Sequence, residues 1–223
     1  MLYLDQWATR LAYVALGWGV VGLIYLSTSL IPHSADSILV LHETLIERRL
    51  IPFIPSMIVW YESFFVFVLL GFFGAPLQRI AQMASALQLS AVFCGMVFVL
   101  FPTTLVYPTV DAASWAGYLW LLTAQIDTDY NCVPSLHAAL TCLVLIAMWD
   151  VRHQLRCFFM VLWAVLILYS IVAVRRHLGV DVLAGSAVAM LMWWLARKLN
   201  TPLLGAVWLK RISDWQTQRA NQS

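Results

Sequence analysis

The chain has 223 residues, of which 62% are hydrophobic and only 11% are charged, and it contains 11 tryptophans. A soluble domain of this length cannot bury so much apolar surface, and a formal net charge of +2 is too small to indicate a nucleic-acid partner. Because apolar stretches near the length of a bilayer crossing recur along the chain, the sequence predicts an all-α integral membrane protein.

The apolar stretches divide the chain into expected membrane spans and short connections. The spans are expected at residues 12–31, 53–74, 84–101, 135–149, 157–174 and 180–195. Residues 1–10 are expected to be a short polar start, and residues 75–83 a short connection. No small-residue cleavage site follows the first span before Pro32, so we expect it to be retained rather than removed as a signal peptide. Residues 1–198 are thus predicted to form one six-span domain, and residues 199–223 a polar, partly amphipathic cytoplasmic tail.

The first span contains Gly17, Gly19 and Gly22, which reproduce the spacing of a dinucleotide-binding motif. That motif requires a preceding strand in a βαβ unit, whereas these glycines lie inside an apolar span. We therefore expect close helix packing at this position, and no cofactor.

The connections carry most of the polar residues. Residues 32–52 lie between two prolines and predict a short amphipathic helix on the outer surface. The longest loop, residues 102–131, has an apolar segment at 113–124 that is too short to be a span but could dip into the interface. Glu62 lies in the middle of the second span, where a carboxylate is costly. It is expected either to form a helix–helix hydrogen bond or to lie near a head-group pocket.

The basic residues are distributed unequally between the two sides of the expected bundle. One side receives Arg10, Arg79, Arg152, Arg156, Arg197, Lys198, Lys210, Arg211 and Arg219. The other receives Arg48, Arg49, Arg175 and Arg176. The positive-inside rule therefore predicts that both termini are cytoplasmic. Short loops and compact length favour a bacterial inner membrane, with the second side facing the periplasm.

Two short histidine-containing stretches lie on that second side. His177 and Asp181 are four residues apart, so on a helix the carboxylate could accept a hydrogen bond from one ring nitrogen and orient the other. Ser135 and His137 lie at the start of another apolar helix. Two histidines and an orienting aspartate are sufficient for covalent catalysis with an acid/base partner. A simple helix-surface interaction is the alternative for the His177–Asp181 pair.

Asn131-Cys132-Val133-Pro134-Ser135-Leu136-His137 and His177-x-x-x-Asp181 together resemble motifs of the type 2 phosphatidic acid phosphatase (PAP2) superfamily. Leu136, where glycine is commoner, and the stretch 51–55 are similar to the branch that contains inositol phosphorylceramide synthases. The resemblance covers roughly residues 50–190. It implies a six-transmembrane helix bundle of the PAP2 type.

The resemblance also implies a role for each motif residue. His177 would attack a membrane lipid phosphate to give a phosphohistidine, Asp181 would orient its ring, and His137 would protonate the leaving oxygen. Ser135 and the backbone amides beside it would hold phosphate oxygens. No metal and no cofactor are implied. Water as acceptor would make the protein a lipid phosphatase, and an alcohol acceptor would make it a head-group phosphotransferase.

The chain departs from the family at three expected cations. Leu100, Tyr107 and Ile171 stand where the family has basic residues. A phosphate in a desolvated pocket is very costly without compensating charge. The candidate replacements, together with Tyr107, are the four arginines of the same side: Arg48, Arg49, Arg175 and Arg176. These arginines could instead be solvated or interfacial. The alternative function is a catalytically degenerate member that binds or scrambles lipid.

Overall fold

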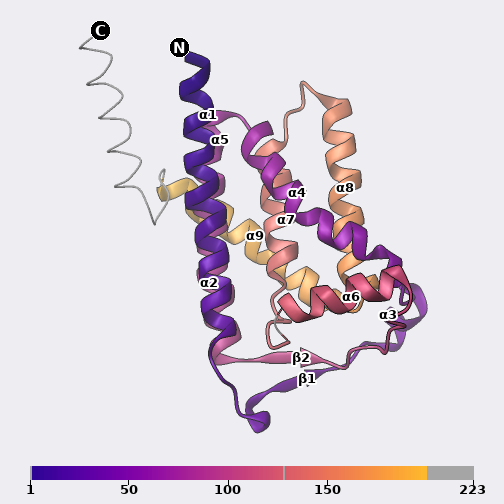
Figure 1. The fold of residues 1–223 in the computed structure, drawn as a ribbon. Coiled ribbons are helices and arrows are strands. Elements are labelled where there is room, and N and C mark those ends of the chain that lie inside the picture. The colour runs from indigo at the N-terminus through magenta and orange to yellow at the C-terminus, as the bar shows by residue number, and fades with distance from the viewer. Residues whose placement is uncertain (1, 128, 200–223) are drawn as a thin grey trace.

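The computed structural model describes residues 2–127 and 129–199. Its helices are α1 (Leu2–Tyr13), α2 (Val20–Ser29), α3 (Leu45–Leu50), α4 (Ile58–Gly74), α5 (Leu77–Leu100), α6 (Trp115–Ile126), α7 (Leu136–Met148), α8 (Gln154–Ala173) and α9 (Gly179–Leu199). Two short strands, β1 (Leu39–Leu41) and β2 (Thr103–Leu105), pair in parallel. Figure 1 shows the long helices as a bundle, with the strands, α3 and α6 gathered at one end of it.

The first helix begins earlier than the sequence predicted. A π-helical segment, Val14–Gly19, joins α1 to α2, so the chain is helical from Leu2 to Ser29 (Figure 1). Residues 2–10, predicted as a short polar start, are thus helical, and the charge of Arg10 is satisfied within the bundle. Its guanidinium donates to the carbonyls of Phe72 and Ala75 at 2.6 and 3.1 Å, which ties α1 to the end of α4.

The third predicted span is also longer than expected. Helix α5 begins at Leu77, so the predicted connection at residues 75–83 is mostly helix. Pro76 directly precedes the helix, a position where proline is well tolerated because no helical hydrogen bond is lost. Ile80 and Met83 are fully buried, so packing of the first turns stabilises this extension.

The prediction of a helical membrane protein is confirmed. Five helical segments in the described part of the chain are long and apolar enough to cross a membrane: Gln6–Ser29, Pro55–Gly74, Leu77–Leu100, Gln154–Ala173 and Gly179–Leu199. Helix α7 is apolar but has only 13 residues, or about 20 Å, against a hydrocarbon core of about 30 Å. It occupies the centre of the bundle and contacts α4, α5, α8 and α9.

The outer segment 32–52 differs from its prediction as one amphipathic helix. It contains the 3-10 turn Ala35–Ser37, strand β1 and the six-residue helix α3. Strands of three residues are too short to produce a recognisable alternation in sequence, so the parallel pair was not predicted. The apolar segment at 113–124 does form a helix, α6, which lies across the end of the bundle (Figure 1). The predicted tail lies outside the described residues, apart from Leu199.

In the first helix, the glycine at position 17 serves close packing between helices. A Cβ atom at Gly17 would lie 2.7 Å from the Phe72 ring and 3.1 Å from the Ala84 side chain. This glycine therefore lets the first helix approach α4 and α5 closely, as expected from its place in an apolar span. A Cβ at Gly19 or Gly22 would meet nothing within 4 Å.

Candidate active site

The turn between α8 and α9 positions His177 at the end of the bundle where the short elements gather. The N–H groups of Arg175 and Arg176 donate to the carbonyls of Val172 and Ile171, at 3.0 and 3.3 Å, in the pattern of a Schellman motif. Arg175 has a φ of 55°, the left-handed conformation that this motif usually assigns to glycine. The reversal places His177 two residues before α9.

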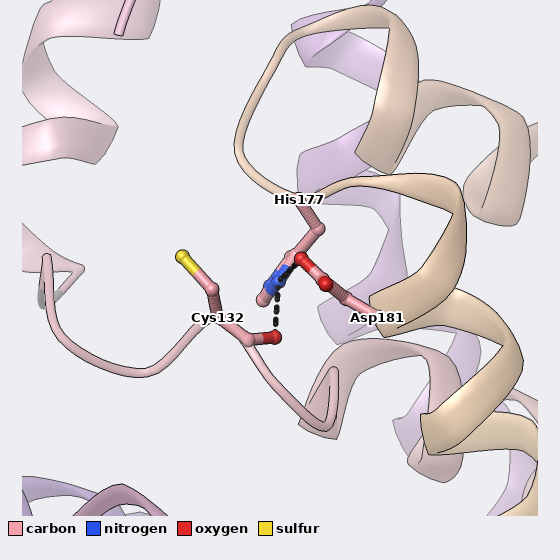
Figure 2. Close-up of side chains that lie close together, drawn as sticks. All are labelled: Cys132, His177 and Asp181. Atoms are coloured by element: carbon pink, nitrogen blue, oxygen red, sulfur yellow. Dashed lines mark hydrogen bonds and ion pairs between the residues drawn. The ribbon is translucent and has the colours of Figure 1, made fainter. Parts of the chain in front are cut away.

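The imidazole of His177 is held by a backbone carbonyl and a carboxylate. Its Nδ1 lies 2.9 Å from the Cys132 carbonyl oxygen and 3.5 Å from Asp181 Oδ2 (Figure 2). Because a carbonyl can only accept, Nδ1 carries the proton, and in the neutral ring Nε2 carries the lone pair. The sequence motif indicates Asp181 but cannot reveal a backbone acceptor, so the role of the Cys132 carbonyl was missed.

Asp181 is fully buried in the first turn of α9. Its Oδ2 accepts the Leu178 N–H at 2.8 Å, whereas Oδ1 has no hydrogen-bond partner among the described residues. The carboxylate is therefore held rigidly beside the His177 ring and retains its capacity to interact with a positive charge there.

The segment that carries the Cys132 carbonyl is fixed to strand β2. The N–H of Cys132 donates to the Thr103 carbonyl at 3.2 Å, and the N–H of Val133 donates to the Thr103 hydroxyl at 3.0 Å. The small parallel sheet thus sets the position of a main-chain group that touches the histidine.

His137 lies close to His177, as the two motifs predicted. Their ring centroids are 6.0 Å apart. The His137 ring packs against Tyr61 and Phe64 of α4, with centroid separations of 4.9 and 4.7 Å. The two predicted catalytic imidazoles are therefore neighbours on α7 and the α8–α9 turn.

Ser135 is the N-cap of α7. Its hydroxyl accepts the Ala138 N–H at 3.3 Å, and its own N–H donates to the Asp181 carbonyl at 3.0 Å. A Cβ at Gly185 of α9 would lie only 2.2 Å from the Ser135 carbonyl oxygen. A glycine at this position is what allows the first turns of α7 and α9 to meet, and with them the two histidine motifs.

Arg176 points into the protein and is 3% exposed. Its Nη2 lies 3.0 Å from Asp127 Oδ2, and its guanidinium lies over the rings of Tyr107 and Trp120, 4.9 and 5.7 Å from their centroids. Its Nη1 is buried and makes no hydrogen bond within the described residues. Burial acts to lower the pKa of Arg176, but Asp127 outweighs it and holds that pKa above its usual range.

Asp127, at the end of α6, joins several elements. It accepts hydrogen bonds from the hydroxyls of Tyr25 on α2 and Tyr61 on α4, in addition to pairing with Arg176. Burial acts to raise the pKa of Asp127, but the guanidinium holds it well below its usual range. Asp127 was not predicted as a site residue; the available signal was an acidic group in a long loop that lacks basic residues.

Arg175 and Arg48 form ion pairs with a second carboxylate, that of Glu43. Arg175 Nη2 and Arg48 Nε each lie 2.9 Å from an oxygen of Glu43. Arg175 also donates to the Ile51 carbonyl at 2.7 Å. Arg49 is exposed and forms no ion pair with the described residues.

Three of the predicted substrate-binding residues line one cavity of about 570 Å³ at the end of the bundle where the short elements gather: Arg48, Tyr107 and Arg175. Leu178, which follows His177 in the chain, also lines it. Ser135 and Arg176 are not among its lining residues. The predicted phosphate-binding groups are therefore divided between this cavity and the interior.

Glu47 of α3 caps the first turn of α9. Its Oε1 accepts the Gly179 N–H at 2.5 Å, and its carboxylate also closes a capping box with Thr44. Burial acts to raise the pKa of Glu47, but the hydrogen bonds from Thr44 and Gly179 together lower it. The Glu47 carboxylate thus lies at the N-terminus of α9, beside the turn that carries His177.

Cys132, His177 and Asp181 could in principle offer metal ligands, since their candidate atoms lie within 4.8 Å of one another. Their hydrogen bonds suit another role, because Nδ1 donates to a carbonyl and Asp181 Oδ2 accepts an N–H. Figure 2 shows the Cys132 sulfur pointing away from the ring, and burial raises the pKa of this thiol. The donor set fits a hydrogen-bonded histidine better than a metal centre.

A comparison with protein families matches the chain over residues 53–195 to the model described as PAP2 superfamily. No curated protein and no solved structure matches the chain. The matched region includes both histidine motifs and runs from before α4 into α9. It leaves out the first helix, β1 and α3.

Proposed function

Because this chain belongs to the PAP2 superfamily, we propose that it is a metal-independent lipid phosphatase or head-group phosphotransferase that acts through a phosphohistidine at His177. The observation that supports this most directly is the state of the His177 ring. Its Nδ1 proton is donated to the Cys132 carbonyl, so Nε2 is left as a nucleophile, and the His137 ring lies 6.0 Å away.

The proposed reaction has two halves, formation of the phosphohistidine and its breakdown. His177 Nε2 attacks the phosphorus, the bond to the leaving oxygen breaks, and His137 gives that oxygen a proton. The positive charge on the phosphorylated ring is stabilised by Asp181, 3.5 Å from Nδ1. Water or an alcohol then attacks the phosphorus and loses its proton to His137, the P–Nε2 bond breaks, and the neutral His177 ring is restored.

Phosphate oxygens need donors that are free to bind them. Arg176 Nη1 is buried with no hydrogen-bond partner in the described part of the chain, and the Asp129 carboxylate with which it forms an ion pair is 3.9 Å away, so it is the strongest candidate. The first backbone amides of α7 beside Ser135 supply further donors. In this proposal the remaining contacts come from Arg48, Arg175 and Tyr107, which line the 570 Å³ cavity, and from the exposed Arg49 beside Arg48 in the chain.

The proposed topology has six spans, with α7 as a short central one. Figure 1 shows the α4–α5 and α7–α8 turns at the end of the bundle opposite the strands, and these turns carry or adjoin Arg79, Arg152 and Arg156. This distribution supports cytoplasmic termini in a bacterial inner membrane, with the histidines facing the periplasm.

The proposal is tested by incubating the purified protein in detergent with a panel of lipid phosphates and phospholipids. Free phosphate and new lipid products are followed by mass spectrometry. His177→Ala is expected to abolish both, and His153→Ala is the matched control, because His153 is an exposed residue paired with Asp150 in the α7–α8 turn. Turnover that persists in His177→Ala would exclude the mechanism.

The same assay separates the two reaction types. Free phosphate without a new phospholipid indicates a phosphatase, and a new phospholipid with little free phosphate indicates a transferase. Leu136 and the stretch 51–55 support the transferase-containing branch related to sphingolipid synthesis, by resemblance alone.

A degenerate, lipid-binding or lipid-scrambling protein is the second candidate. It is favoured by the pairing of Arg175 with Glu43 and of Arg176 with Asp127, which neutralises two of the expected phosphate-binding cations. Transbilayer movement of a fluorescent lipid in vesicles, at the same rate in wild type and His177→Ala, together with no turnover on the panel, would favour this function.

A further inference from the structure

A second cavity lies beside His137, inside the bundle. It has a volume of about 210 Å³, is lined by the first helix, α4, α6 and α7, and opens to the surface of the bundle beside the exposed side chains of Leu26 and Phe65. Its wall is mainly apolar, with side chains such as Trp18, Leu26 and Phe65. An interior of this kind suits a hydrocarbon chain.

The carboxylates in the wall of this cavity are not balanced by a lysine or arginine in the same wall. Glu62 and Asp127 both line it, and no lysine or arginine is among its lining residues. Asp127 is already paired with Arg176, which approaches it from outside the cavity. Glu62 accepts a single hydrogen bond, from the Thr123 hydroxyl at 2.5 Å, among the contacts within the described residues. The carboxylate available to a ligand is therefore that of Glu62.

We propose that this cavity binds a single-chain lipid whose head carries an ammonium group, with the ammonium at Glu62 and the chain along α2 and α4. A bound ammonium favours the ionised carboxylate, whereas a phosphate or carboxylate head would be repelled by it. A phosphate monoester is thus assigned to the histidine turn, and a cationic lipid to this cavity.

His137 connects this cavity with the proposed reaction. Its ring lines the wall, so a hydroxyl next to the ammonium would meet the group that exchanges protons with the alcohol. The bound lipid is then the alcohol partner, as acceptor or as leaving group. This role rests on the proposed function, but binding of the lipid does not.

The wall formed by the first helix lies outside the region matched by the family, residues 53–195. Gly22 contributes to this wall, and a Cβ there would meet nothing within 4 Å. A large side chain at position 22 can therefore fill the cavity without disturbing the backbone. Gly19 is equally open but does not line the cavity, so it provides a matched control.

The test uses the full-length protein in nanodiscs and two photoreactive probes with the same alkyl chain, one ending in an amine and one in a carboxylate. Labelled peptides are identified by mass spectrometry. The amine probe is expected to label α2 and α4 and the carboxylate probe to label them weakly. Glu62→Gln should reduce amine labelling by about tenfold or more, the effect of one charge-assisted hydrogen bond. Gly22→Phe should reduce it by a similar factor, because the ring occupies the space that the lipid chain needs.

Two controls should retain wild-type labelling: Gly19→Phe, and Asp111→Asn, which removes an exposed carboxylate outside the cavity. Equal labelling by both probes in wild type, or amine labelling unchanged in both Gly22→Phe and Glu62→Gln, would overturn the proposal. His177→Ala should label normally, so loss of catalysis and loss of this site give different results.

Discussion

The Cys132 carbonyl fixes the proton on His177 Nδ1. It therefore has the orienting role that the aspartate usually has in a histidine–aspartate pair. The carbonyl selects the tautomer and orients the ring, at 2.9 Å. Asp181, at 3.5 Å, then contributes mainly by stabilising positive charge on the ring. A nucleophilic histidine held in this way keeps its geometry when the carboxylate is neutralised.

Asp181→Asn is therefore expected to lower kcat by roughly 10²-fold, the usual loss of one electrostatic stabiliser, while KM changes little. The measurement is steady-state turnover on whichever lipid phosphate proves to be a substrate. Asp150→Asn, in the α7–α8 turn, is the control and should match wild type. An equally large effect in both variants, or no effect in Asp181→Asn, would contradict this division of roles.

The ion pair between Asp127 and Arg176 is expected to be sensitive to acid. The pKa of Asp127 in the folded state is lower than the unfolded value of about 3.9, because Arg176 favours the carboxylate once burial is overcome. The folded state therefore binds fewer protons than the unfolded state. The stability from this group is fully present above about pH 4 and is lost as the pH falls further, toward the folded pKa.

Asp127→Asn is expected to cost about 3–5 kcal/mol at neutral pH, because it leaves the Arg176 guanidinium buried without its partner. Thermal unfolding in detergent between pH 6 and 3 measures this. Wild type should lose stability below about pH 4 more steeply than the variant does. Parallel pH profiles, with the variant as stable as wild type, would contradict this role for Asp127.

At the scale of elements, the α8–α9 turn carries an arginine where its backbone favours glycine. Arg175 is held at φ 55° while its side chain pairs with Glu43 and donates to Ile51. Arg175→Ala and Arg175→Gly lose the same side-chain contacts, but only glycine relieves the left-handed backbone. The alanine variant should be less stable than the glycine variant by about 1 kcal/mol.

Unfolding of the two Arg175 variants under identical detergent conditions tests this difference. If alanine and glycine are equally destabilising, the turn must relax away from the left-handed conformation. If glycine is more stable than wild type, the Arg175–Glu43 pair contributes less than the strained backbone costs.

The sequence predicted the apolar helices but not the short elements that set up the site. Periodicity and length indicated α4, α8 and α9 to within a few residues, because long apolar segments dominate the pattern. The parallel strands β1 and β2 have three residues each and depend on contacts between distant segments. The carbonyl of Cys132 is positioned by β2, so this part of the site could not be read from side-chain patterns.

At the scale of the whole molecule, the site combines the two histidine motifs predicted from sequence with partner residues that the sequence did not indicate. His137 and His177 come together because α7 and α9 meet at Gly185. Arg175 and Arg176 were predicted to bind phosphate, but their carboxylate partners, Glu43 and Asp127, were not predicted. Both acids lie in outer segments whose path depends on tertiary packing.

The proposed orientation predicts which loops are accessible from outside the cell. Single cysteines at the exposed positions Asp36 and Asp111 should react with a membrane-impermeant maleimide in intact cells or right-side-out vesicles. A cysteine at Arg152, in the α7–α8 turn, should react only after permeabilisation. The native cysteines are buried or half-buried, and the unmodified protein provides their background. Labelling of all three positions from one side would exclude the six-span topology.

The most direct test of the account is to detect the covalent intermediate. The full-length protein is mixed with the substrate found in the lipid panel, quenched at alkaline pH to preserve phosphohistidine, and digested for mass spectrometry. Because His137 is both the acid of the first half and the base of the second, His137→Gln should form the adduct and lose it more slowly than wild type. We expect phosphate on His177 in wild type and in His137→Gln, and none in His177→Asn. Phosphate on another residue, or turnover by His177→Asn, would contradict it.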